Sequence, residues 1–127
     1  MATIKSFTDI TQSKKLAEIL PLESADMVYV HTTDLEGDEH YDIDFRRNQP
    51  LFEDDVCAWS LVALLSVLPM ITKGKENANP FITKTPDNEY YVVYATLTKE
   101  VDCSGIYDNP VDACVDMIEK LNELKIL

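Results

Sequence analysis

The chain is poor in glycine, with only three among its 127 residues. Phosphate-binding loops of the GxGxxG and Walker types need several glycines close together. Gly37, Gly74 and Gly105 are too far apart in the sequence to form either motif. The sequence therefore excludes the common glycine-rich nucleotide-binding loops.

Cysteine is also scarce, and long apolar runs are missing. Cys57, Cys103 and Cys114 form no CxxC pair, and an odd number is not typical of a secreted disulfide framework. The first residues hold no apolar run of the kind found in signal peptides. The longest apolar stretch, residues 56–71, contains two serines and a proline, and it is shorter than the roughly 20 residues of a membrane span. These features predict a cytoplasmic protein with reduced thiols and no membrane segment.

Basic residues are few. The chain has 11 lysines and arginines and 23 aspartates and glutamates, which gives a net charge of −12. The acidity is concentrated in residues 23–55, where eleven carboxylates against Arg46 and Arg47 leave a charge of −9. Such a surface repels phosphate, which argues against direct binding of nucleic acid or of an anionic membrane. It would attract a basic protein partner, or it serves solubility alone.

What the chain does contain is an alternation of helix and strand patterns over residues 1–127, a length that suits a single domain. The periodicity predicts helices over residues 11–21, 56–68 and 109–127, with N-caps at Ser13, at Asp54 or Asp55, and at Asn109. It predicts strands over residues 25–33, 40–46, 80–85 and 89–98, and a loop or short edge strand at 102–108.

This order, α-ββ-α-ββ-α, predicts an α+β fold in which three helices pack on an antiparallel sheet of four to five strands. The middle helix is apolar nearly all round, so we expect it to be central and covered on several sides. Aligning the two LxxxLP segments, residues 16–21 and 64–69, suggests an internal duplication. Such short matches also arise by chance, and the sequence leaves both interpretations open.

Two segments, WSLVALLSVLP (59–69) and NPVDACVDMIEKLNELKIL (109–127), resemble parts of small uncharacterised proteins from phages, prophages and mobile elements of gut anaerobic bacteria. In those proteins an SLxxLLxxLP-like helix precedes a strand pair, and the chain closes on a helix with a DAxxxMIxxLxENKLI-like end. The residues in step with that ending are Asp112, Ala113, Met117, Ile118, Leu121, Asn122, Glu123, Lys125 and Leu127. The resemblance implies an intracellular accessory protein outside the membrane, and it implies no catalytic residue.

Both histidines and six carboxylates lie in one stretch, HTTDLEGDEHYDID (31–44). Its glycine and its carboxylates lack the spacing of an EF-hand calcium loop. His31 and His40 could approach each other across a hairpin, so a His/Asp metal site stays open. The alternation of apolar and acidic residues favours a charged hairpin instead, in which His31 shares a solvent face with Asp42 and Asp44.

The segment EYYVVYATL (89–97) carries apolar or aromatic residues on both faces of an expected strand. One face should meet the helices. Because three short helices should not cover both faces, we expect the face with Tyr90, Val92 and Tyr94 to stay open. This face would then form an interface with a partner or, most simply, with a second copy in a dimer.

No pair of nucleophile and base stands out in the sequence. Cys57 follows three carboxylates, which oppose thiolate formation, and Cys114 falls on the apolar face of the last helix. Cys103 lies in a loop and is the most exposed of the three by expectation. We therefore expect no catalytic residue, no cofactor and no bound metal.

Three functional hypotheses follow. The first is a non-catalytic interaction or accessory protein that binds a protein partner or itself. The second is an acidic decoy that mimics nucleic acid and inhibits a basic nucleic-acid-binding protein. The third is a metal-dependent enzyme.

Overall fold

The computed structural model describes residues 4–46, 51–73 and 75–127 of the chain. In chain order its elements are α1 (Ile10–Ile19), the single 3-10 turn η1 (Leu22–Ser24), β1 (Met27–Thr33), β2 (Glu39–Phe45), β3 (Val56–Ala58), α2 (Leu61–Val67), β4 (Ile71–Lys73), β5 (Glu76–Lys84), β6 (Tyr90–Ala95), β7 (Glu100–Cys103) and α3 (Pro110–Glu123). The fold is α+β, as the sequence predicts. None of the helices in these three segments has the length and apolar character to cross a membrane.

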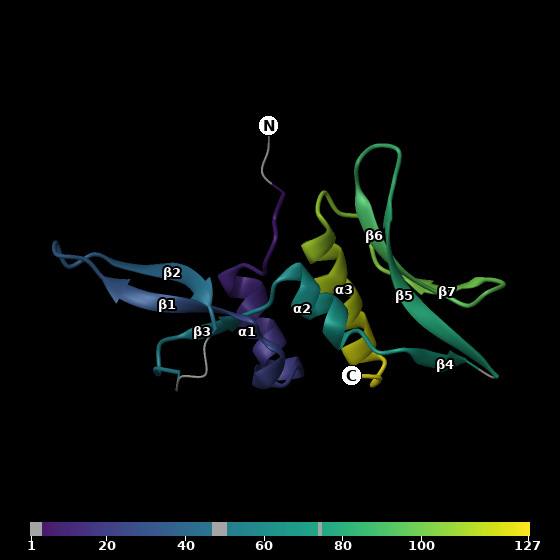
Figure 1. Ribbon diagram of the computed structural model, residues 1–127, viewed down its shortest axis with the longest axis horizontal. Coiled ribbons are helices and arrows are strands. Elements are labelled where there is room, and N and C mark those ends of the chain that lie inside the picture. The colour runs from purple at the N-terminus through teal and green to yellow at the C-terminus, as the bar shows by residue number, and fades with distance from the viewer. Residues whose placement is uncertain (1–3, 47–50, 74) are drawn as a thin grey trace.

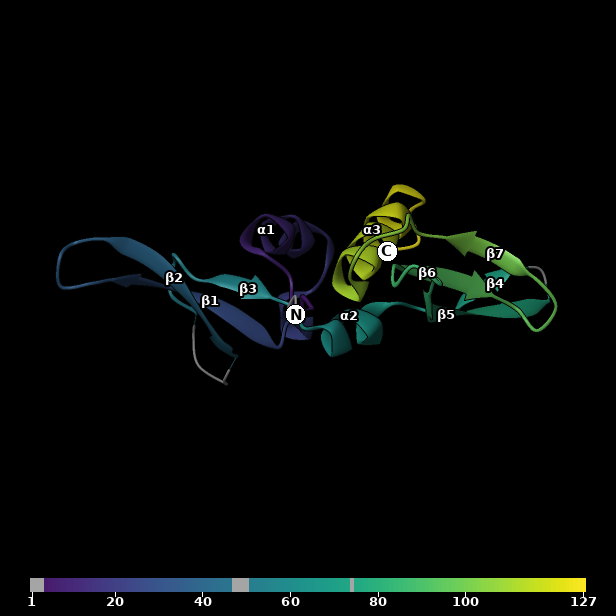
Figure 2. The same ribbon diagram turned by 90° about the horizontal axis from the view of Figure 1, so that it is seen from above.

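The strands form two antiparallel sheets, ordered β2-β1-β3 and β4-β5-β6-β7, rather than the single predicted sheet. The two sheets lie at opposite ends of an elongated molecule, and the helices lie between them (Figures 1 and 2). The β1–β2 hairpin stands out from the helices on one side, whereas the second sheet packs directly against α3.

Two short strands are absent from the sequence prediction. The predicted helix over residues 56–68 begins only after Ser60, whose hydroxyl caps α2 by accepting a hydrogen bond from the Ala63 N–H at 3.2 Å. Residues 56–58 instead form β3, which pairs with β1 so that Cys57 lies opposite Val28. The loop predicted after α2 contains β4, which pairs with the start of β5.

Of the three predicted helix caps, two are wrong and one is confirmed. Neither Asp54 nor Asp55 caps α2, because this helix begins only after Ser60. Asp9, not Ser13, caps α1, because its Oδ1 accepts from the Gln12 N–H at 2.8 Å while the Gln12 side chain returns a bond to the Asp9 N–H. Ser13 lies within α1, and its side chain is fully buried. Asn109 caps α3 as predicted, with its side-chain oxygen accepting from the backbone of Asp112 at 2.8 Å.

The core lies between the helices and one face of the second sheet. Eight of the 14 residues of α3 are buried, so α3 is the central helix. Its neighbours in the core include Leu16 of α1, Leu64 of α2 and Tyr94 of β6. Fully burying one such side chain contributes about 1.5–3 kcal/mol. The predicted central helix, α2, instead leaves one side open, where Val62 is 72% exposed.

The two LxxxLP segments both end helices, since Leu20 and Leu68 are the C-cap residues of α1 and α2. The elements that follow differ, with a 3-10 turn and three strands after α1 and four strands after α2. The internal duplication stays a prediction.

Candidate functional site

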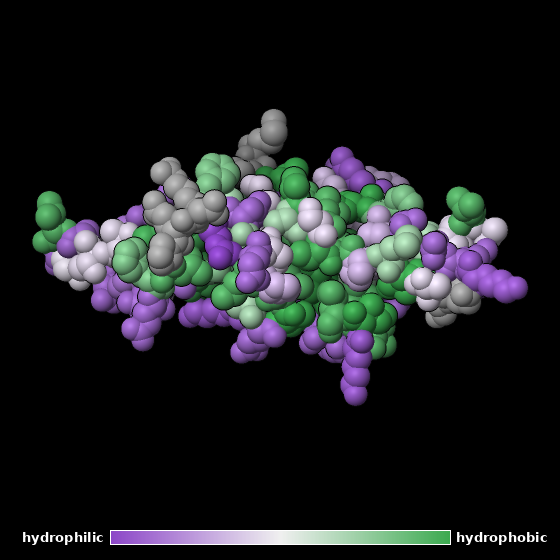
Figure 3. Space-filling view, turned by 60° about the horizontal axis from the view of Figure 1, so that its bottom comes forward, coloured by the Kyte–Doolittle hydropathy of each residue, from purple (hydrophilic) through white to green (hydrophobic). Residues whose placement is uncertain are grey.

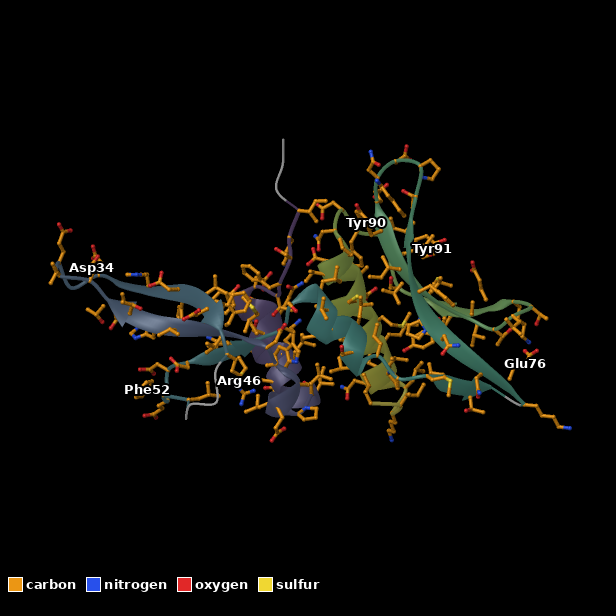
Figure 4. The ribbon with its side chains drawn as sticks, viewed as in Figure 1. Asp34, Arg46, Phe52, Glu76, Tyr90 and Tyr91 are labelled. Atoms are coloured by element: carbon orange, nitrogen blue, oxygen red, sulfur yellow. The ribbon has the colours of Figure 1, made fainter. Side chains whose placement is uncertain are left out.

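The β1–β2 hairpin agrees with the two strands predicted around the histidine-containing stretch. Residues 27–45, here called the acidic arm, comprise β1, β2 and the turn that joins them. In this turn Asp34 Oδ1 accepts hydrogen bonds from the N–H groups of Glu36 and Asp38, each at 2.9 Å. Gly37 has a φ of +87°, a conformation that glycine adopts without strain. The tip of the arm, marked by Asp34 in Figure 4, is therefore an ordered turn far from the helices.

Burial falls steadily along the arm. Met27 and Val28, at its base, are buried, whereas Thr33, at the end of β1, is exposed. Beyond the base, the arm lies outside the core. Its carboxylates are all exposed: Asp34, Glu36, Asp38, Glu39, Asp42 and Asp44. Within the described segments, none of these six forms an ion pair with a lysine or an arginine.

The two histidines lie on opposite faces of the arm. His31 pairs with Tyr41 across the strands, and their rings meet edge to face at 5.3 Å. His40 lies on the other face, with its Nε2 3.3 Å from a carboxylate oxygen of Asp42. The prediction that His31 shares the face of Asp42 is therefore wrong, and the two imidazoles do not converge on one ion. No group of three or more His, Cys, Asp or Glu side chains in the described parts of the chain could hold a metal ion.

The predicted interface on β6 is part of the core. Val92 and Tyr94 have no exposed surface, and the Tyr94 hydroxyl donates a hydrogen bond to the Pro69 carbonyl at 2.7 Å. Burial raises the pKa of Tyr94 to about 12. Tyr90 is partly buried, and its backbone forms a bridge with Tyr107.

The expectation of an open face at these positions is thus wrong, because α3 packs along the side of β6 that bears Val92 and Tyr94. Tyr90 and Tyr91 lie on opposite sides of β6 in Figure 4. The face that points away from the helices carries Tyr91 and Phe81, the latter 54% exposed. Self-association stays a prediction, and it would have to use a surface other than the predicted one.

Two of the three cysteines are buried and one is exposed. Cys114 is fully buried, and burial raises the pKa of its thiol to about 12. Cys57 is also buried, and its thiol pKa is raised by burial and by the charge of Asp55. Cys103 is exposed on the edge strand β7. Cys114 thus lies in the core, as its position on the apolar face of the last helix predicts, and Cys103 is the most exposed of the three, as expected.

A second acidic feature lies between α1 and α3. Two open cavities of about 250 and 430 Å³ share Lys15 and Glu119 in their linings. Asp112, in the smaller cavity, accepts hydrogen bonds from Lys5 at 2.9 Å and from Gln12 at 2.7 Å. These bonds join the N-terminal segment, α1 and α3, so this carboxylate already has a structural role. Sequence reasoning missed this junction because its partners are about a hundred residues apart in the chain.

The surface between the sheets is apolar. Figure 3 shows hydrophobic side chains gathered over α2 and the C-terminal residues, and hydrophilic side chains along the lower side of the arm in that view. The exposed apolar residues of this region are Val62, Leu65, Met70, Leu124 and Ile126. The acidic arm therefore presents charged side chains, whereas the surface over α2 and the C-terminal residues presents apolar ones.

Comparisons with protein-family models, with curated protein sequences and with solved structures find no match to this chain. The function must therefore be inferred from the residues of the arm and of the surfaces around it.

Proposed function

We propose that the protein is a non-catalytic binding protein whose acidic arm holds a basic surface of a protein partner. The observation that carries the proposal is the set of six exposed carboxylates, which have no lysine or arginine partner among the described residues, on a hairpin that extends beyond the core.

The charges of the arm suit binding better than stability. An exposed ion pair contributes only about 0.2–1 kcal/mol, but several pairs formed together add to a useful affinity. A concentrated charge of one sign also steers a partner of opposite charge and raises its association rate. The strand ladder and the turn at Asp34 hold the carboxylates in a fixed order, so little conformational entropy is lost on binding.

The carboxylates of the α1–α3 cavities are less available. Asp112 is bound by Lys5, Gln12 and Asn109, and Asp116 accepts from the Gly105 N–H at 2.7 Å. A basic partner would have to replace these bonds before it gained its own. The arm therefore supports the proposal better than the cavities do.

The acidic decoy is a second candidate, because the arm concentrates carboxylates on one hairpin. The strand β2 is about 24 Å long and carries three of them, or roughly one per 8 Å, and the joining turn carries three more. A single nucleic-acid strand carries about one charge per 3.4 Å, and a duplex twice as many. Along β2 the arm is therefore less densely charged than nucleic acid, and it comes nearer to a single strand only at the turn, so the decoy is the weaker candidate.

The proposal also includes the cytoplasm as the compartment of the protein and a phage or mobile element as its origin. The buried, unpaired thiols of Cys57 and Cys114 fit a reducing compartment such as the cytoplasm. An origin in a phage or a mobile element is supported only by the helical segments 59–69 and 109–127.

The test measures binding of the full chain to immobilised polylysine over a range of salt concentrations. The arm variant carries Asp38→Asn, Asp42→Asn and Asp44→Asn. The matched control, at the other end of the molecule, carries Asp87→Asn, Glu89→Gln and Glu100→Gln. We expect the arm variant to bind at least about tenfold more weakly than the control, with a shallower dependence on salt.

Equal losses in the two variants would show that net charge alone drives binding. A wild-type chain that does not bind polylysine at low salt would contradict the proposal. To test the decoy, a basic single-strand-binding protein replaces polylysine. The decoy candidate requires that single-stranded DNA and the acidic protein displace each other, and independent binding of the two would remove it.

A further inference from the structure

Among the described residues, the outer edge of β2 is a long strand edge without a neighbouring strand. β2 is the terminal strand of its sheet and has seven residues, whereas β3, β4 and β7 have three or four. Native proteins usually shorten, cover or charge such edges, because the unpaired backbone groups attract further strands. This edge is charged, but it is neither short nor interrupted by proline.

The register shows which backbone groups face outward. Arg46 N–H donates to the Asp26 carbonyl at 2.9 Å, and Asp34 N–H donates to the Asp38 carbonyl at 2.9 Å. Antiparallel ladders alternate between bonded and non-bonded pairs, so the even-numbered residues of β2 bond to β1. The N–H and C=O groups of Tyr41 and Ile43 therefore point away from the sheet, and no described residue bonds to them.

The two faces of β2 differ in chemistry. One face carries Asp42 and Asp44, both exposed. The other carries Tyr41, Ile43 and Phe45, of which Phe45 is 72% exposed. A strand laid beside this edge would meet carboxylates on one face and apolar side chains on the other.

We propose that this edge accepts an extended segment of a basic partner protein as an added strand, in which basic residues alternate with apolar ones. The inference rests on the proposed function, and it specifies how the arm binds. The added strand receives its backbone bonds from Tyr41 and Ile43. Its lysines or arginines lie beside Asp42 and Asp44, and its apolar side chains cover Phe45.

A second copy of the chain does not fit this edge. If two β2 strands pair over their full length about a two-fold axis, Asp42 lies directly opposite Asp42 of the other copy. Like charges in that position destabilise a strand pair. Charge complementarity therefore favours a basic partner over self-association here.

The probe is a synthetic peptide of about ten residues in which lysine alternates with valine. The control peptide has the same sequence with N-methylated valines, so that it keeps every charge but loses the donors that would face β2. We expect the control to bind at least about tenfold more weakly. We also expect hydrogen exchange of the Tyr41 and Ile43 amides to slow at least about tenfold with the unmethylated peptide.

A pair of protein variants gives a second measurement. Ile43→Pro removes an outward donor at a position where an edge strand tolerates proline, and Ile43→Ala removes the side chain but keeps the donor. We expect the proline variant to lose more affinity for the peptide than the alanine variant. If Ile43→Pro unfolds the arm, the two peptides still decide the question.

The outcomes separate this inference from the proposed function. Equal binding of the two peptides, without protection of the two amides, would overturn strand addition and leave the basic-surface proposal standing. Binding of polylysine but of neither peptide would do the same. If the protein binds neither polylysine nor either peptide, both proposals are overturned.

Discussion

The two sheets at the ends of this molecule are both antiparallel, yet they differ in where their side chains lie. In the second sheet, Val92 and Tyr94 are fully buried against α3. In the first sheet, only the base of β1 is buried, and β2 has no buried residue. Residues 56–101, which include most of the second sheet, have no net charge, whereas residues 23–55 carry −9.

The comparison indicates that stability and charge are separated along the molecule. The core around α3 gains its free energy from apolar burial, and charges there would have to be desolvated. The acidic arm keeps its carboxylates in water and removes little apolar surface from it. An arm that contributes little to stability can therefore hold charges for a partner.

The largest expected effect is at the second sheet. Tyr94→Ala should lower the free energy of unfolding by about 3–5 kcal/mol, because it leaves a cavity beside α3 and the Pro69 carbonyl without its donor. The control is Tyr91→Ala, on the opposite face of β6. Denaturation in urea measures both variants, and equal losses would contradict the assignment of the buried face.

A smaller effect is expected at the junction of α1 and α3. Asp112→Ala should cost about 2–3 kcal/mol, because Lys5, Gln12 and Asn109 all donate to this carboxylate. Asp87→Ala, in the exposed β5–β6 turn, is the matched control and should cost less than about 0.5 kcal/mol. A stable Asp112→Ala variant would show that the helices are held by apolar contacts alone.

Because of Asp112, we expect the wild type to lose stability in acid. This loss should be smaller than the one caused by Asp112→Ala. Burial raises the pKa of Asp112, but the hydrogen bonds from Asn109 and Gln12 and the bond and charge of Lys5 outweigh it and lower the pKa. The stabilisation is therefore complete above the unfolded pKa of 3.8 and is lost as the pH falls through the lower folded value.

Urea denaturation between pH 5 and pH 2 measures this dependence. The curve of Asp112→Asn should fall less steeply than that of the wild type. Parallel curves would mean that other carboxylates, such as Asp9, whose pKa is also lowered despite burial, determine the acid response.

Local signals explain which parts of the fold could be predicted. The cap at Asn109 is followed directly by a proline, and together these residues specify where α3 begins. Before residues 56–68, Asp54 and Asp55 look like caps, but the helix begins only after Ser60. Whether the first residues of this segment form a helix or a strand is decided by pairing with β1, which lies about thirty residues away.

The candidate site shows the same limit. The alternation in β6 separates its two faces correctly, but both are apolar, and only the position of α3 determines that Val92 and Tyr94 are covered. In the acidic arm, the turn between Asp34 and Asp38 sets the register, and a shift of one residue exchanges the faces. The sequence does not specify this register, and the structure places His31 opposite Tyr41 rather than on the face of Asp42.

The smallest effect is expected in the arm, and it tests the separation most directly. The variant with Asp38→Asn, Asp42→Asn and Asp44→Asn should change the free energy of unfolding by less than about 0.5 kcal/mol, or raise it slightly. All three carboxylates are exposed, and their removal lowers repulsion among like charges.

Because salt screens this repulsion, added salt should stabilise the wild type more than the variant in urea denaturation. The control with Asp87→Asn, Glu89→Gln and Glu100→Gln removes equal charge from a region without net charge, so its response to salt should follow the wild type. A loss above about 1 kcal/mol in the arm variant would mean that these carboxylates stabilise the hairpin, and the separation of stability from charge would fail.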